Sequence, residues 1–161
     1  MDDLLPKAEK IAALLKERRQ TIALAESAAG GLISAALLAM PGASSYFVGS
    51  AILYTRTSRE ALLELPPQAL EGIRPSSQAF VLLLAKAIRE RCGTTWGVAE
   101  SGAAGPSGNR YGDRAGHACI AIAGPIEKAV TLDTFDSGRI GNMRAFAGAA
   151  LDLLEQVLSR S

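Results

Sequence analysis

Two segments of the chain place a glutamate and a serine between an apolar run and a run of small residues. They are residues 25–31 (Ala-Glu-Ser-Ala-Ala-Gly-Gly) and 99–106 (Ala-Glu-Ser-Gly-Ala-Ala-Gly-Pro). A strand that enters such a turn and then a helix directs backbone N–H groups at one point, where glycines leave room for a ligand. Two such turns on neighbouring strands would face each other across a crevice. We expect a ligand site there, lined by Ser27, Gly30, Ser101, Gly102 and Gly105; the alternative is a tight turn with a serine cap.

A second set of residues could supply a nucleophile. Ser44 follows the Pro-Gly turn at 41–42, Tyr54 ends the next apolar segment, and Arg59 lies five residues further on. A serine beside a tyrosine and a cation can form a nucleophilic site without histidine, because the neighbours manage the hydroxyl proton. Serines after such a turn are more often helix caps or turn residues.

Arg139 stands in the first turn of the last predicted helix, where its charge opposes the helix macrodipole. A residue placed against local preference can have a functional role, here a planar fork for phosphate or carboxylate. The alternative is a surface arginine that folds back on an acidic neighbour.

Composition excludes several other classes of protein. The single histidine, His117, excludes histidine-based metal clusters and is expected to be a hydrogen-bonded core or edge residue. No Walker loop or dinucleotide fingerprint is present. The 17 basic and 16 acidic residues give no electrostatic case for nucleic acid or an anionic membrane. We expect a cytoplasmic protein with reduced cysteines, no metal, no cofactor and no nucleic-acid or membrane partner.

The periodicity of the apolar residues predicts one α/β domain over residues 1–161. We expect a three-layer α/β/α sandwich with a mixed, mostly parallel sheet. Helices are predicted near 4–19, 32–40, 58–63, 76–91 and 139–158, and strands near 21–25, 46–55, 95–99, 116–123 and 128–135. The glycine-rich segment 101–115 is predicted to be a functional loop. Apolar residues on more than one face of helix 76–91 indicate burial on two sides, which favours a homo-oligomer.

Four motifs in this order resemble the C-terminal domain of the CinA (competence/damage-inducible) proteins, over about 4–158. The family's Ala-Glu-Ser-Cys-Thr-Gly-Gly is similar to 25–31, and its Pro-Gly-Ser-Ser, followed by Phe and a strand ending in Tyr, is similar to 41–54. Its Thr/Ser-Gly-Ile-Ala-Gly-Pro is similar to 101–106, and its Phe-Pro-Gly-Asp-Arg to 135–139. The family includes stand-alone nicotinamide mononucleotide deamidases.

The resemblance implies metal-independent hydrolysis of the nicotinamide amide to an acid and ammonia. Ser44 falls on the nucleophile position and Tyr54 on the tyrosine that assists it. Ser101 and Arg139 fall on substrate-binding positions, and Gly42 on a backbone contact. The small-molecule partner would be a pyridine nucleotide.

Arg59 departs from the family pattern, which has lysine at this position. Lysine can act as a base when it is desolvated, whereas arginine keeps its proton. Arg56 also replaces an asparagine, and Ala28-Ala29 replace Cys-Thr. Our hypothesis is an altered amidohydrolase that uses Tyr54 as its base. The alternatives are a nucleotide-binding module without turnover and a structural or partner-binding domain.

Overall fold

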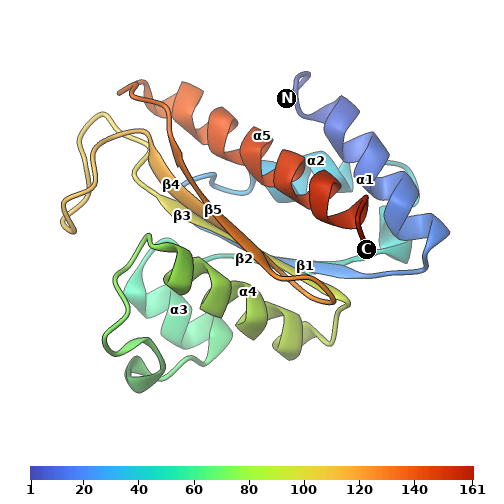
Figure 1. The fold of residues 1–161 in the computed structure, drawn as a ribbon, viewed down its shortest axis with the longest axis horizontal. Coiled ribbons are helices and arrows are strands. Elements are labelled where there is room, and N and C mark those ends of the chain that lie inside the picture. Colours follow the sequence, from blue (N-terminus) through green and yellow to red (C-terminus); the bar gives the residue numbers. More distant parts are fainter.

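The apolar runs of the chain pair into one five-stranded sheet in the computed structural model, which describes residues 1–161 (Figure 1). The strands are β1 (Ile22–Glu26), β2 (Phe47–Ile52), β3 (Trp96–Gly102), β4 (His117–Ala123) and β5 (Lys128–Asp133), in the order β2-β1-β3-β4-β5. Strands β2, β1 and β3 are parallel, and β4 pairs antiparallel with both neighbours. Only β4 therefore runs against the others, as a mixed, mostly parallel sheet requires.

Helices cover both faces of this sheet (Figure 1). On one face lie α1 (Leu5–Glu17), α2 (Leu32–Leu38) and α5 (Arg139–Leu158); on the other lie α3 (Arg56–Leu63) and α4 (Gln78–Cys92). Two 3₁₀ turns, η1 (Ala43–Ser45) and η2 (Pro67–Leu70), complete the elements. The predicted three-layer α/β/α architecture is confirmed, and β1 is buried along its whole length because it packs against helices on both faces.

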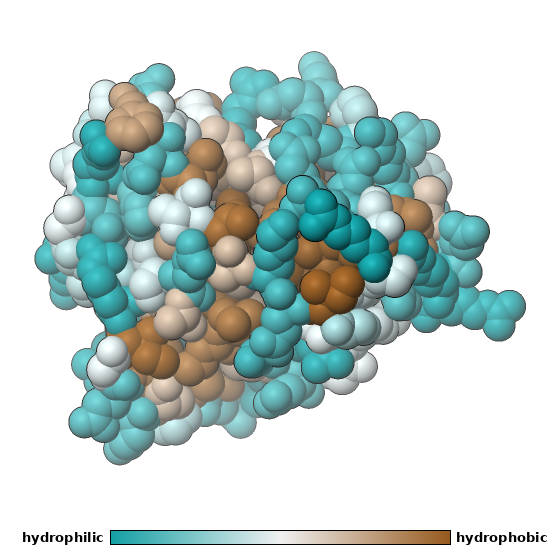
Figure 2. Space-filling view, viewed as in Figure 1, coloured by the Kyte–Doolittle hydropathy of each residue, from teal (hydrophilic) through white to brown (hydrophobic).

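The second apolar face of α4 is covered in part within the chain. Besides its contacts with β1, β3 and β4, the layer of α4 includes side chains from the segment that precedes it: Leu63, Leu65, Leu70 and Ile73. These contacts account for part of the apolar surface of α4, whereas Leu83 stays half-buried outside both core clusters, and the homo-oligomer stays a prediction. On the face seen in Figure 2, apolar side chains reach the surface in patches separated by polar ones.

Helix caps fix where the site-bearing segments begin. Ser77 caps α4 by accepting a hydrogen bond from the Phe80 N–H at 3.2 Å, close to the predicted start at residue 76. Helix α3 begins earlier than predicted, because Thr55 is its N-cap and exchanges hydrogen bonds with Ser58 in a capping box. No helix has the length and apolar character needed to cross a membrane.

Candidate functional site

The carboxyl ends of β2, β1 and β3 lie at one edge of the sheet because these strands are parallel. The chain leaves β1 for β2 on one side and later enters β3 on the other side, so the strand order reverses between β1 and β3. Open α/β sheets bind ligands at such a switch point. Ser27 follows β1 directly, and Ser101 lies near the end of β3.

A cavity of about 460 Å³, here called the edge cavity, opens at this switch point. It brings together five of the predicted site residues (Ser27, Tyr54, Arg59, Ser101 and Gly102), from four different segments. Its complete lining is Ser27, Tyr54, Thr55, Arg56, Arg59, Pro75, Phe80, Ser101, Gly102, Asn109, Arg110 and Tyr111. The two Ala-Glu-Ser turns therefore do meet at one cavity, as the sequence predicts.

The backbone N–H groups of the first Ala-Glu-Ser turn are not available to a ligand in the edge cavity. The buried Glu26 carboxylate accepts hydrogen bonds from the N–H groups of Gly31, Ile33 and Ser34 and from the Ser34 hydroxyl. A side chain of the protein thus occupies the N-terminus of α2, where the sequence predicts a ligand. Desolvation raises the pKa of Glu26, although these hydrogen bonds act in the opposite direction.

Glu100, on the neighbouring strand β3, also accepts backbone hydrogen bonds from this turn. Its Oε2 accepts hydrogen bonds from the N–H groups of Ser27 (3.0 Å) and Ala29 (2.8 Å), while Oε1 is buried and has no partner. Complete burial raises the pKa of Glu100 to about 7, with a smaller contribution from the nearby Glu26. The two glutamates, to which sequence reasoning gave no role, hold the turn that carries Ser27. Their position directly before the turn was the signal available.

The two serines differ in how their hydroxyls are held. The Ser101 hydroxyl lies 3.0 Å from the Ser76 hydroxyl and is buried, whereas the Ser27 hydroxyl makes no hydrogen bond within the chain. Ser27 therefore presents an unengaged hydroxyl to the edge cavity, on a turn whose backbone is fixed by Glu100.

Tyr54 and Arg139 lie together at the rim. Arg139 is the first residue of α5, and its guanidinium donates hydrogen bonds to the Gly105 carbonyl (2.7 Å) and to the Tyr54 hydroxyl (3.2 Å). Tyr54 is 60% exposed and lines both the edge cavity and an adjoining cavity of about 220 Å³, which Arg139 and Gly105 also line. Arg139, expected to bind substrate, thus contacts the 101–106 turn through the Gly105 carbonyl.

Ser44 and Gly42 lie away from the other predicted site residues. Ser44 is in η1, before β2, and Tyr54 follows β2, so a strand of six residues separates them. Such a strand spans about 20 Å. Neither Ser44 nor Gly42 lines a cavity with Tyr54 or Arg59. Within one chain, the predicted Ser44–Tyr54–Arg59 group and the oxyanion contact at Gly42 are therefore not assembled.

The predicted glycines act mainly through close backbone approach. A Cβ at Gly102 would lie 2.3 Å from the His117 carbonyl oxygen, and one at Gly105 would lie 2.5 Å from the Ser137 oxygen. Both positions still line cavities at this edge. Gly30 has a φ of +66° in the turn but lines none of the cavities.

The loop between β3 and β4 supplies residues that the sequence analysis did not single out. Asn109, Arg110 and Tyr111 line the edge cavity. The loop is anchored by Asp113, which accepts hydrogen bonds from Arg74 and from Asn109, each at 2.8 Å. This anchoring supports the prediction that the loop is part of the site.

His117 is a hydrogen-bonded residue at the start of β4, as expected, with Nε2 2.9 Å from the Ser76 carbonyl oxygen. No group of three or more histidine, cysteine, aspartate or glutamate side chains has a metal-binding arrangement.

Comparisons with known proteins identify one family. The model of the CinA C-terminal domain matches residues 5–158. The chain is 38% identical over 138 residues to a CinA-like protein of Parasynechococcus marenigrum, covering 86% of this chain and 32% of that protein. It is 36% identical to one of Synechococcus elongatus, covering 94% of this chain and 36% of that protein. The chain thus spans about a third of the length of these relatives.

Solved structures with this fold carry the same family name. A CinA superfamily protein of Klebsiella pneumoniae superimposes with a TM-score of 0.90 at 21% identity, covering 98% of this chain and 99% of that one. A competence/damage inducible protein of Agrobacterium tumefaciens gives a TM-score of 0.86 at 24% identity, covering 98% and 96%. At these identities the likeness shows a shared fold.

Proposed function

Because the chain belongs to the CinA C-terminal domain family, we propose that it hydrolyses the carboxamide of nicotinamide mononucleotide or a related pyridine nucleotide, without a metal. The observation that carries the proposal is the edge cavity, which places the unengaged Ser27 hydroxyl with Tyr54 and Arg59 at the switch point of the sheet. The family resemblance supports the substrate class, and the lining of the edge cavity supports the choice of residues.

In this mechanism Ser27, rather than Ser44, is the nucleophile. Its oxygen attacks the carboxamide carbon and its hydroxyl proton passes to the Tyr54 oxygen, while the Tyr54 phenol gives its own proton to the amide nitrogen. The Arg139 guanidinium donates a hydrogen bond to the Tyr54 oxygen at 3.2 Å and holds it in place. Arg59 stabilises the oxyanion, because its charge is permanent. The C–N bond breaks once the nitrogen carries the proton from Tyr54, and ammonia leaves. Water then hydrolyses the Ser27 ester: its hydroxyl forms the acid and its other proton returns to the serine oxygen.

A matched pair of serine variants tests the assignment. We expect purified protein to release ammonia from nicotinamide mononucleotide, and Ser27→Ala to lower the rate by roughly 10³-fold or more. Ser44→Ala, at the other end of β2, is expected to keep the wild-type rate. Loss of activity in Ser44→Ala, with Ser27→Ala unaffected, would overturn the choice of nucleophile.

One observation favours a second function, nucleotide binding without turnover. Arg59 replaces the lysine of the family pattern and cannot accept a proton. In that case calorimetry would detect binding of the mononucleotide while no ammonia appears. Arg59→Lys would then be expected to give activity, and its failure to do so would count against a lost base as the reason.

A further inference from the structure

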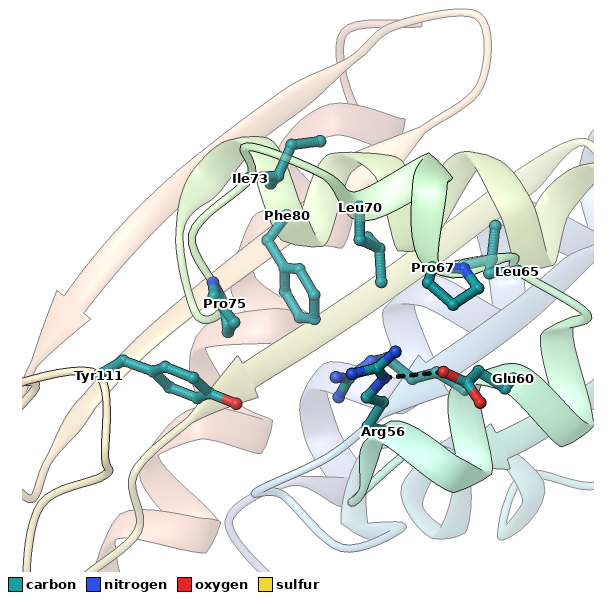
Figure 3. Close-up of a pocket in the computed structure, with 10 residues that line it drawn as sticks. Arg56, Glu60, Leu65, Pro67, Leu70, Ile73, Pro75, Phe80 and Tyr111 are labelled. Carbon is teal, nitrogen blue, oxygen red and sulfur yellow. Dashed lines mark hydrogen bonds and ion pairs between the residues drawn. The ribbon is translucent and has the colours of Figure 1, made fainter.

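A second cavity, here called the side cavity, lies beside the edge cavity under the segment that links α3 to α4 (Figure 3). Its volume is about 270 Å³. The apolar walls are Leu65, Pro67, Leu70, Ile73, Pro75 and Phe80. Arg56, Arg59 and Tyr111 line both cavities, so the two adjoin.

The two arginines of the side cavity differ in their partners. Arg56 Nε donates to Glu60 at 2.8 Å, and Figure 3 shows this pair along one wall. Arg59 forms no ion pair with any carboxylate, and its Nε is buried without a hydrogen-bond acceptor. The Arg59 guanidinium lies over the Phe80 ring, 5.3 Å from its centre. A buried donor without an acceptor is costly, so an acceptor brought by a ligand would gain from meeting it.

The size and walls of the side cavity restrict what it can hold. An apolar cavity of about 150 Å³ is large enough for benzene. A volume of about 270 Å³ thus holds one aromatic ring with a small substituent, whereas a whole nucleotide would have to extend into the edge cavity.

We propose that the side cavity binds the ring of an aromatic carboxylate, whose charged group accepts a hydrogen bond from Arg59. The apolar walls and Phe80 contact the ring. The carboxylate is preferred over the carboxamide because Arg59 forms no ion pair, has a buried Nε–H without an acceptor and offers only donors. This inference goes beyond the proposed function, because it requires only binding and no turnover. The preferred ligand is an acid, which is also the chemical class of the product of the proposed amide hydrolysis.

Titrations with isosteric small molecules test this proposal on the full chain. The probes are benzoate, benzamide (same ring, no charge) and acetate (same charge, no ring), followed by NMR of the ¹⁵N-labelled protein, including the arginine Nε–H signals. We expect benzoate to bind about tenfold or more tightly than either other probe, as a charge-assisted hydrogen bond predicts, and to shift the Arg59 Nε–H signal.

Arg56 provides the matched control. Arg59→Gln is expected to abolish the preference for benzoate over benzamide, whereas Arg56→Gln, which loses an arginine already paired with Glu60, keeps it. Ile73→Trp, which fills the side cavity and leaves both arginines in place, is expected to block binding. Equal binding of benzoate and benzamide, a preference that survives Arg59→Gln, or no saturable binding of benzoate would each overturn the proposal.

The titration and the ammonia assay can fail separately. Benzoate binding in a protein that releases no ammonia would support the side cavity and reject the amidase. Ammonia release by a protein that does not distinguish benzoate from benzamide would do the reverse.

Discussion

The two Ala-Glu-Ser turns share three residue types and yet differ in almost every contact. After Ser27 the chain leaves the sheet, so the turn has backbone N–H groups that need acceptors, and both Glu26 and Glu100 supply them. After Ser101 the strand continues to pair with β4, and the Ser101 hydroxyl meets Ser76. Identical sequence at two strand ends thus gives one serine a free hydroxyl and the other an engaged one. The path of the chain after each serine decides this difference.

The largest expected effect comes from removing the carboxylate that serves the first turn. Glu26→Ala leaves three backbone donors and the Ser34 hydroxyl without their acceptor, which should cost roughly 3–4 kcal/mol of unfolding free energy. Urea denaturation measures this loss of unfolding free energy, with Glu17→Ala, at an exposed position, as the control variant. A loss below about 1 kcal/mol would mean that water replaces the carboxylate, and the difference between the turns would be smaller than the contacts indicate.

The second prediction concerns the pH dependence of stability. The pKa of Glu100 is about 7 in the folded chain, against an ordinary value of 4.5. The folded state therefore binds this proton more tightly, so the stabilisation is fully present below about pH 4.5 and is lost as pH rises through 7. The contribution that is lost amounts to roughly 3 kcal/mol.

Glu100→Gln isolates that contribution, because Gln mimics the protonated carboxyl and does not titrate. The wild type should lose stability relative to Glu100→Gln between pH 5 and pH 8.5, as measured by urea denaturation at both pH values. A constant difference between the two proteins would show that Glu100 does not titrate in this range.

A smaller effect is expected at the second turn. Ser101→Ala removes the hydroxyl contact with Ser76 in a buried place, so the unfolding free energy should fall by about 1 kcal/mol. Thermal and urea denaturation both report this change. An unchanged stability would mean that the Ser76 hydroxyl finds another acceptor.

The smallest effect on stability is expected for the residue proposed to matter most for activity. Ser27→Ala removes a hydroxyl without an internal partner, so stability, measured by the same urea denaturation, should change by less than about 0.5 kcal/mol. A large loss would place Ser27 among the structural residues and remove the contrast with Ser101.

The fold could be predicted from the sequence because each element carries its own periodicity. The stripe of α5 and the continuous apolar runs of β1 and β3 identify their elements without knowledge of any contact. The loop anchor at Asp113 could not be predicted, because its partner Arg74 is 39 residues away in the sequence.

The site could be predicted in part. Ser27 and Ser101 follow strands that the pattern marks clearly, and they do share one cavity. Ser44 is grouped with Tyr54 by residue type and spacing as well as by the family resemblance, although the strand predicted between them already implies opposite ends of that strand. Whether Arg59 forms an ion pair depends on which acidic side chains lie near it in space. The spacing of residues along the chain does not determine which side chains those are.

The internal anchoring of the first turn by Glu26 and Glu100 has a consequence for recognition. A loop that needs a phosphate to order it becomes rigid only when occupied, and part of the binding free energy is lost to that ordering. Here two side chains of the protein accept the hydrogen bonds of the turn, so the turn has its ordered conformation before any ligand binds. Association should then involve little rearrangement, and the bound and unbound backbones of residues 26–34 should superimpose closely.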